Sequence, residues 1–284
     1  MTSAVVDDII LRALDEDAPW GDITSEAFLP DEARATASLV PREAGVLSGI
    51  EVFARVFALV GPDAVVELGA VDGSAFEAGV VLARVEGSAR SVLRAERIAL
   101  NLAQRMSGIA TVTARYVAAV AGTRARIVDT RKTTPGLRIL ERQAVRDGGG
   151  HNHRFSLSDA IMAKDNHLAV LAAAGVPIGD AIRSARARIG HTVHLEVEVD
   201  RLDQVEEVVA AGVDTIMLDN FSLDELRAGV ALVAGRAVVE ASGGVTLETV
   251  AEIARTGVDV ISVGALTHSV RSLDLGLDVD VSAG

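Results

Sequence analysis

The sequence contains no cysteine, so disulfides, thiolate–zinc sites and a cysteine nucleophile are all excluded. Aromatic residues make up only 3% of the 284 residues, and the core must therefore consist mainly of valine, leucine, isoleucine and alanine. No stretch approaches the roughly 20 apolar residues that a membrane span needs. The N-terminus shows no basic segment before an apolar run, which argues against a signal peptide. These absences predict a soluble cytoplasmic protein without a membrane partner.

Positive charge is also scarce, because the formal net charge is −13. Nucleic-acid binding needs a basic face, so we expect no nucleic-acid partner. The segment from Arg126 to His167 is the exception, with eight arginines and lysines against five acidic residues. A cationic segment in an acidic protein indicates a small anionic ligand.

Lysine is nearly absent as well. Lys132 and Lys164 are the only lysines among 27 basic residues, and both lie in the cationic segment. A lysine is a compact point charge, whereas arginine is a planar fork, so a site that contacts one oxygen closely can require lysine. The shared location of the two lysines favours a functional role over chance.

The chain changes character near residue 95. Before it, a helical pattern at 5–15 and a helix near 50–60 accompany short alternating segments typical of antiparallel strands. After it comes a long helix or a broken pair, with Gly108 as the expected break, and then short apolar runs alternate with helices. This alternation predicts an α/β fold with parallel strands joined by right-handed crossovers.

Polar residues and glycines follow the apolar runs. The last four of these positions, Glu198, Asp219, Ser242 and Gly264, recur at steps of 21, 23 and 22 residues, one strand–helix unit each. In an α/β barrel the functional residues lie at the carboxyl ends of the strands, so one register brings these residues together on one rim. An open doubly wound sheet is the alternative, but no strand is followed by the G-x-G-x-x-G pattern.

Two glutamates alternate with valines in one predicted strand. Glu196 and Glu198 are two residues apart and therefore face the same side, toward the barrel interior. Buried carboxylates are costly unless they meet cations, hydroxyls or a metal. We expect Glu196 to pair with an arginine inside the barrel, and Glu198 to lie at the rim.

The rim offers a phosphate site and a cationic wall. Glycine-rich turns in "EASGGVT" and "SVGALTHS" precede helices, where backbone N–H groups bind phosphate. The cationic wall suits carboxylates, and Glu198 and Asp219 suit Mg²⁺ or ribose hydroxyls. The wall consists of Arg131, Lys132, His153, Arg154 and Lys164. The expected ligand is a polyanion with separate phosphate and carboxylate groups. A Schiff base at Lys164 is a less favoured alternative, given its anionic-ligand context.

Six ordered motifs resemble the quinolinate phosphoribosyltransferase family, over about residues 8–278. They are "DTRKTTPGLR", "AVRDGGGHNHRFSLSDAIMAKDNH", "EVEVD", "IMLDNF", "EASGGV" and "SVGALTHS". The resemblance implies that quinolinate and phosphoribosyl pyrophosphate react, with Mg²⁺, to give nicotinate mononucleotide, CO₂ and pyrophosphate in NAD biosynthesis. It also implies an N-terminal α/β sandwich domain over 1–105, joined by the tail 271–284. An incomplete, seven-stranded α/β barrel would follow over 106–270.

The same resemblance implies roles for individual residues. The quinolinate carboxylates would be held by Arg131, His153, Arg154 and Lys164, with Arg97 donated across a homodimer interface. Lys132 would meet the pyrophosphate, while Glu198 and Asp219 would hold the ribose hydroxyls and the metal. The remaining substrate-binding residues would be Thr130, Ser242, Gly243, Gly244, Ser262, Val263 and Gly264, of which the two turns would hold the 5-phosphate. Lys132, Glu198 and Asp219 are the expected catalytic residues, whereas His151 and His167 are expected to be structural.

Two alternatives compete with this interpretation. A related phosphoribosyltransferase-like protein found with molybdate transport has the same fold, but the intact "HNHR" and "AKDNH" motifs argue against it. A barrel that only binds a phosphate would need neither Glu198 nor Asp219. Asp147 departs from the family pattern and places a negative charge near the cationic wall, where it would weaken dicarboxylate binding or pair with Arg146.

Overall fold

The computed structural model describes residues 4–280 and divides the chain into two compact units. The first unit comprises the described parts of residues 1–114, 133–149 and 266–284, and the second comprises residues 115–132 and 150–265. The division expected from the sequence, at residue 105, remains a prediction, and residues 281–284 of the expected tail lie outside the described residues. No single described helix is long and apolar enough to cross a membrane, although the bent pair α6 (Asp165–Ala173) and α7 (Ile178–Arg188) meets the criteria of length and composition together.

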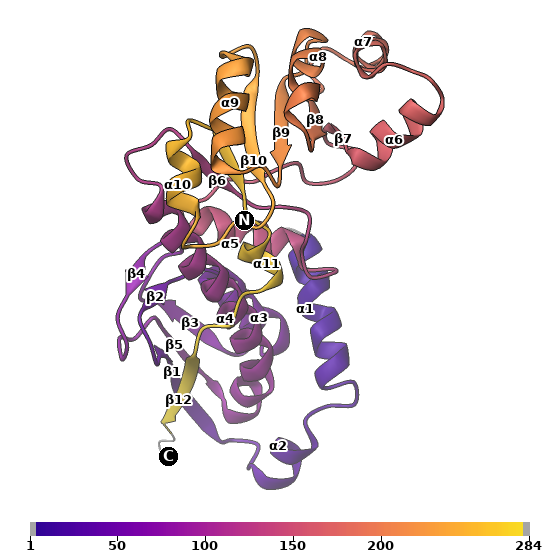
Figure 1. The fold of residues 1–284 in the computed structure, drawn as a ribbon. Coiled ribbons are helices and arrows are strands. Elements are labelled where there is room, and N and C mark those ends of the chain that lie inside the picture. The colour runs from indigo at the N-terminus through magenta and orange to yellow at the C-terminus, as the bar shows by residue number, and fades with distance from the viewer. Residues whose placement is uncertain (1–3, 281–284) are drawn as a thin grey trace. The chain divides into compact units, whose positions relative to one another are not determined.

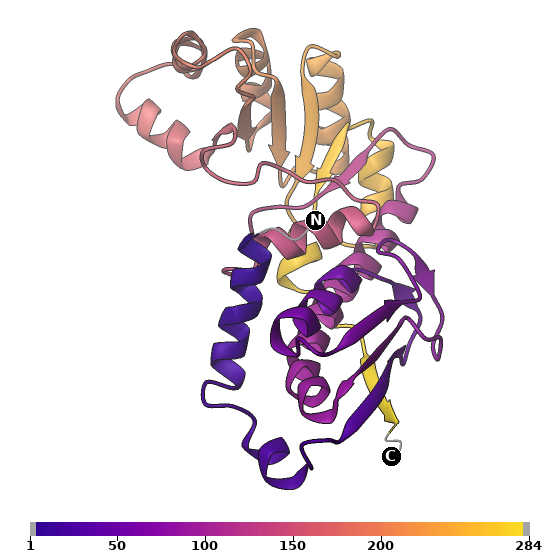
Figure 2. The ribbon, with the colours of Figure 1, turned by 180° about the vertical axis from the view of Figure 1, so that it is seen from behind.

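The first unit is built on a four-stranded antiparallel sheet in the order β12-β1-β5-β3. Helices α3 and α4 cover one face of this sheet (Figures 1 and 2). The strands are β1 (Arg34–Pro41), β3 (Val65–Leu68), β5 (Ala83–Ser88) and β12 (Leu275–Asp280), with a separate pair β2 (Gly45–Val46) and β4 (Ala75–Phe76). The helices that lie wholly or mostly in this unit are α1 (Ala4–Asp17), α2 (Ile23–Phe28), α3 (Ile50–Val60), α4 (Ala89–Ala119), α5 (Arg138–Asp147) and α11 (Ala265–His268).

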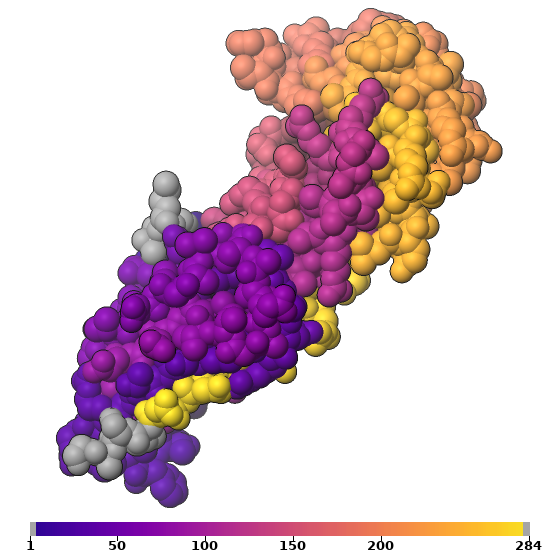
Figure 3. All heavy atoms as spheres, turned by 90° about the vertical axis from the view of Figure 1, so that its left-hand side faces the viewer, coloured from indigo at the N-terminus to yellow at the C-terminus, as the bar shows by residue number. Residues whose placement is uncertain are grey.

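Strand β12, at the end of the described chain, belongs to the same sheet as the N-terminal strand β1. It pairs antiparallel with β1, with Leu277 opposite Leu39, and Figure 3 shows it lying along the N-terminal segments. The buried faces of α3 and the sheet meet in an aliphatic core that contains one aromatic pair, Phe53 and Phe57, with ring centroids 5.0 Å apart.

Helix α4 is continuous through Gly108, so the long helix is confirmed and the alternative, a break at Gly108, is wrong. The glycine has a packing function instead, because a Cβ at this position would lie 2.3 Å from the carbonyl oxygen of Arg271. No larger side chain fits between the helix and this segment, which leads into β12.

Asp147 ends helix α5 and lies within the first unit. Its Oδ2 accepts a hydrogen bond from the Ser48 hydroxyl at 2.6 Å, and burial raises the pKa of this carboxyl. The Asp147 carboxylate therefore has a hydrogen-bond partner, Ser48, that is far from it in the sequence and that the sequence pattern did not indicate.

The second unit is a parallel sheet of six described strands in the order β6-β11-β10-β9-β8-β7, with helices following the strands. The strands are β6 (Arg126–Val128), β7 (Ile161–Ala163), β8 (Leu195–Val199), β9 (Thr215–Asp219), β10 (Val238–Ser242) and β11 (Val260–Ser262). Besides α6 and α7, the helices are η1 (Leu202–Gln204), α8 (Val205–Ala210), α9 (Leu223–Val233) and α10 (Val250–Arg255). The α/β fold class is confirmed.

The expected count of seven barrel strands differs from the described sheet. The sheet does not close over the described residues, and beyond β6 there is only a single bridge between Val128 and His151. The segment after His151 then runs to β7, at the opposite edge of the sheet, without forming a strand. Most of its residues are polar, so it lacks the sustained apolar alternation that a strand needs.

Candidate active site

A pocket of about 380 Å³ lies at the carboxyl ends of the parallel strands. It is lined by Thr130, Arg131, Lys132, His153, Arg154, Met162, Lys164, Glu198, Met217, Asp219, Ser242 and Ser262. A larger cavity of about 700 Å³ beside α6 and α7 has a mostly aliphatic lining, which suits an anion poorly. The strand-end pocket is therefore the candidate active site, and ten of the predicted site residues meet in it.

The other five predicted residues do not line this pocket. Gly243 and Gly244 follow β10, and Val263 and Gly264 follow β11, so they lie in the two turns next to Ser242 and Ser262. Arg97 is exposed on α4 in the first unit. Met162 and Met217 were not predicted; they supply the apolar part of the wall.

Lys164 and Glu198 form an ion pair across the ends of β7 and β8, where Lys164 Nζ donates to Glu198 Oε2. Lys164 caps the start of α6, and its backbone N–H donates to Nδ1 of His167 at 3.0 Å. His167 thus stabilises the helix start, and His151 uses its backbone to bridge β6. Neither imidazole lines the pocket.

Asn220 fixes the carboxylate of Asp219 at the end of β9. Its Nδ2 donates to Asp219 Oδ2 at 2.6 Å, and its backbone N–H donates to the Ser242 carbonyl at 2.9 Å. Asn220 adopts the left-handed conformation, with φ of 59°, which asparagine tolerates better than most residues. A Cβ on Gly243 would lie 2.2 Å from Asn220 Oδ1, so glycine is required there. The sequence pattern did not single out Asn220 as a site residue.

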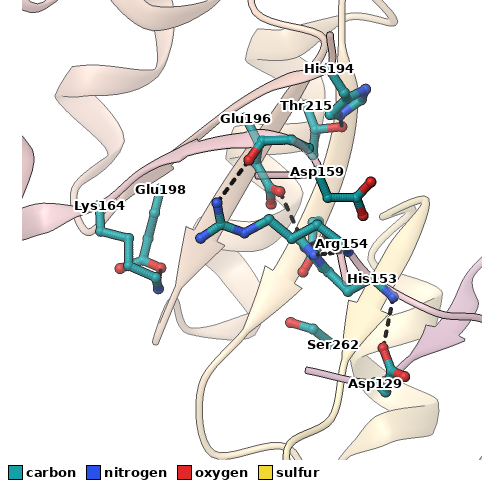
Figure 4. Close-up of polar contacts among 12 residues, drawn as sticks. Asp129, His153, Arg154, Asp159, Lys164, His194, Glu196, Glu198, Thr215 and Ser262 are labelled. Atoms are coloured by element: carbon teal, nitrogen blue, oxygen red, sulfur yellow. Dashed lines mark hydrogen bonds and ion pairs between the residues drawn. The ribbon is translucent and has the colours of Figure 1, made fainter. Parts of the chain in front are cut away.

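His153 contacts two buried glutamates inside the sheet, and Figure 4 shows the contact with Glu196. Its Nε2 lies 3.1 Å from Glu196 Oε2 and 3.5 Å from Glu240 Oε2, and each glutamate is 3% exposed. The expected partner of Glu196, an arginine, is therefore wrong: histidine reaches this depth because its segment crosses the open side of the sheet. Glu240 was missed, although it lies two residues before Ser242 on the same face of its strand, the spacing that pointed to Glu196 and Glu198.

Burial and hydrogen bonding act in opposite directions on the protonation of His153. Burial alone would lower the pKa of His153, but hydrogen bonds to Glu196 and Glu240 outweigh it and raise the pKa to about 10. Burial also raises the pKa of Glu196. The Arg154 backbone N–H lies 2.7 Å from His153 Nδ1, which accepts this hydrogen bond when Nδ1 carries no proton and leaves Nε2 as the donor to the glutamates.

Arg154 is held at the pocket wall by its Nη1, which donates to the carbonyl of Ala160 at 2.9 Å. Burial lowers the pKa of Arg154, and the neighbouring charge of Arg131 lowers it further. Two mutually repelling guanidinium groups on one wall are stabilised when an anion binds between them. This wall is suited to carboxylates.

Comparison with known proteins agrees with this geometry. A family model described as quinolinate phosphoribosyl transferase, C-terminal domain, matches residues 109–278, and the N-terminal domain model of the same family matches residues 22–107. The nicotinate-nucleotide pyrophosphorylase [carboxylating] of Mycobacterium leprae is 47% identical over 278 residues, covering 96% of each chain. The probable enzyme of that name from Bacillus subtilis is 43% identical over 267 residues, covering 94% of this chain and 91% of the relative. The crystal structure of NadC from Streptococcus pyogenes superposes with a TM-score of 0.94 at 43% identity, covering 100% of this chain and 99% of that one.

Proposed function

The chain belongs to the quinolinate phosphoribosyltransferase family, and from this premise we propose how its pocket performs the reaction. The enzyme transfers the phosphoribosyl group of phosphoribosyl pyrophosphate to quinolinate and decarboxylates the product to nicotinate mononucleotide. The observation that carries the proposal is the convergence of arginine, lysine and histidine side chains opposite two carboxylates at the strand ends.

Quinolinate occupies the cationic wall. Its two adjacent carboxylates pair with Arg131 and Arg154, whose planar forks match carboxylate oxygens, and with Lys164 as a point charge. His153 lies behind Arg154 and completes this half of the pocket. The apolar side chains of Met162 and Met217 are suited to contact the pyridine ring.

Phosphoribosyl pyrophosphate occupies the opposite half. Glu198 and Asp219 accept hydrogen bonds from the ribose hydroxyls, and Lys132 pairs with the pyrophosphate. The 5-phosphate is held by backbone N–H groups in the turns Ser242–Gly244 and Ser262–Gly264, which precede helices. Thr130, whose hydroxyl accepts the backbone N–H of Lys132 at 3.1 Å, fixes the direction of the lysine.

The donor set fits Mg²⁺. Glu198 and Asp219 come from adjacent strands and are hard oxygen ligands. Mg²⁺ typically takes one or two protein carboxylates and completes its shell with water and substrate phosphates, so two carboxylates suffice. When bound, the ion would neutralise charge on the leaving pyrophosphate.

The protein accelerates the transfer by positioning and electrostatics. The wall holds the pyridine nitrogen toward C1 of the ribose, and the carboxylates of Glu198 and Asp219 stabilise positive charge that develops on the sugar as pyrophosphate leaves. Once the new N–C bond makes the ring a pyridinium, the C2–carboxylate bond breaks. Its electron pair remains at C2 beside the positive nitrogen, CO₂ departs, and C2 then takes a proton.

We also propose a cytoplasmic homodimer in which Arg97 of each subunit completes the pocket of the other, since Arg97 is exposed and does not line the described pocket. At quinolinate concentrations well below the wild-type KM, variants Arg97→Ala and Arg154→Ala should each have little activity. Dissociated and reassembled as a one-to-one mixture, they should recover roughly a quarter of wild-type activity, because half of the dimers carry one intact site. A mixture as inactive as its components would contradict donation across the interface.

The substrate assignment is tested with purified protein, phosphoribosyl pyrophosphate and Mg²⁺. Nicotinate mononucleotide should form from quinolinate and not from nicotinate, because nicotinate lacks the second carboxylate that the wall binds. EDTA should abolish the activity and added Mg²⁺ should restore it. Turnover of nicotinate without quinolinate would contradict the proposal.

A further inference from the structure

Three buried carboxylates surround the segment Asn152–Arg154, and none of them has a place among the substrate contacts proposed above. Asp129 follows β6, Glu196 lies on β8 and Glu240 lies on β10. Glu240 and Glu198 are both in register with Met217, whereas Glu196 is in register with Thr215. Glu196 therefore lies one layer deeper than the rim, and Glu240 lies in the layer of Glu198.

The carboxylates hold a segment that belongs to no helix or strand. Asp129, which is fully buried, accepts the backbone N–H of His153 at 2.7 Å and the side-chain amide of Asn152 at 2.6 Å. The ring of His153 then reaches Glu196 and Glu240 through Nε2. Between His151 and β7 the chain contains only turns and irregular backbone, and these contacts are among those that set its path.

The two glutamates depend on His153 in turn. Their Oε1 atoms are buried without a hydrogen-bond partner within residues 4–280, so Nε2 of His153 is the polar contact that each carboxylate makes there. A buried carboxylate without a hydrogen bond is strongly disfavoured. The ring is consequently held in one orientation, and with it the backbone N–H of Arg154, which lies 2.7 Å from Nδ1.

We propose that Glu196 and Glu240 are positioning residues for the dicarboxylate substrate, acting through His153 to place the guanidinium of Arg154. This inference rests on the proposed assignment of the Arg154 wall to quinolinate. It predicts that removing either charge weakens quinolinate binding without a comparable effect on phosphoribosyl pyrophosphate, whose contacts lie on the other side of the pocket.

The test compares Glu240→Gln and Glu196→Gln, which keep side-chain length, with the control Glu206→Gln. Glu206 pairs with Arg236 outside the pocket. Each buried variant should raise KM for quinolinate roughly tenfold, the size expected from losing a hydrogen bond to a charged group. KM for phosphoribosyl pyrophosphate should stay within about twofold, as should both constants in the control. Equal increases in both KM values would show a merely structural role and overturn the proposal.

A double substitution tests the route through His153. In the His153→Ala background, Glu240→Gln should change KM for quinolinate by less than about twofold, because the residue through which it acts is gone. A further tenfold increase in that background would contradict the proposal.

A substrate-independent measurement separates this inference from the proposed function. In ¹⁵N NMR spectra of the free enzyme, the ring signals that disappear in His153→Ala should shift in both glutamine variants and remain in place in Glu206→Gln. Unshifted signals would overturn the proposed action of Glu196 and Glu240 on His153. Shifted signals in an enzyme that does not bind quinolinate would overturn only the assignment of the cationic wall to quinolinate. A stoichiometric transition metal in the purified protein would also overturn the positioning role of the two glutamates, because His153, Glu196 and Glu240 lie close enough together to ligate a metal ion.

Discussion

Arg154→Ala should weaken quinolinate binding by about 10- to 100-fold, since a hydrogen bond to a charged group contributes about 1.5–3 kcal/mol. The guanidinium is fixed by the Ala160 carbonyl, so the wall presents it without further ordering. The Arg154→Ala substitution removes one of the two planar guanidinium groups that match the substrate's carboxylates. The dissociation constants of quinolinate and phosphoribosyl pyrophosphate, measured separately by calorimetry, report the two halves of the pocket.

The matched control is Arg183→Ala, which removes an exposed arginine that pairs with Asp180 on α7. It should leave both dissociation constants unchanged. If Arg154→Ala weakened both ligands equally, the division of the pocket into a dicarboxylate half and a phosphoribosyl half would be wrong.

Asp219→Asn should lower kcat by about 10²–10³-fold, the effect of removing one preorganised group that stabilises transition-state charge. The substitution keeps the shape of the side chain but removes the negative charge opposite the ribose. Quinolinate binding should change little, because the cationic wall is intact. Single-turnover kinetics at saturating concentrations of both substrates separates this loss from a loss of affinity.

Asp224→Asn is the corresponding control, since Asp224 lies on the exposed side of α9 and pairs with Arg227. Its kcat should match that of the wild type. An Asp219→Asn enzyme with normal kcat and a raised KM for phosphoribosyl pyrophosphate would show that the carboxylate contributes to ground-state binding only.

The sequence predicted the strand ends well because parallel strands impose a simple rule. Once Glu198, Asp219 and Ser242 recur at one strand–helix spacing, a single register brings them to one edge, and the structure places all three in the pocket. Lysine usage pointed to Lys132 and Lys164 on independent grounds. The strand–helix spacing and the positions of the two lysines can both be read directly from the order of residues along the chain.

Pairwise contacts were less predictable, because they depend on which segments cross in space. Nothing local indicates that His153 extends inward to Glu196 and Glu240, or that Gly108 is required by the carbonyl of Arg271. The three-residue strands β6, β7 and β11 are too short to carry their own periodicity, so their pairing is set by the sheet around them. The seventh barrel strand is not formed within residues 4–280, because the segment after His151 is mostly polar.

The most direct test of the account uses quinolinate labelled with ¹⁴C in the 2-carboxyl group, together with phosphoribosyl pyrophosphate and Mg²⁺. We expect labelled CO₂ and nicotinate mononucleotide to appear in a one-to-one ratio, and neither to form when quinolinate is replaced by nicotinate. Release of pyrophosphate without labelled CO₂, or label retained in the nucleotide, would contradict the central claim that this pocket binds and decarboxylates a pyridine dicarboxylate.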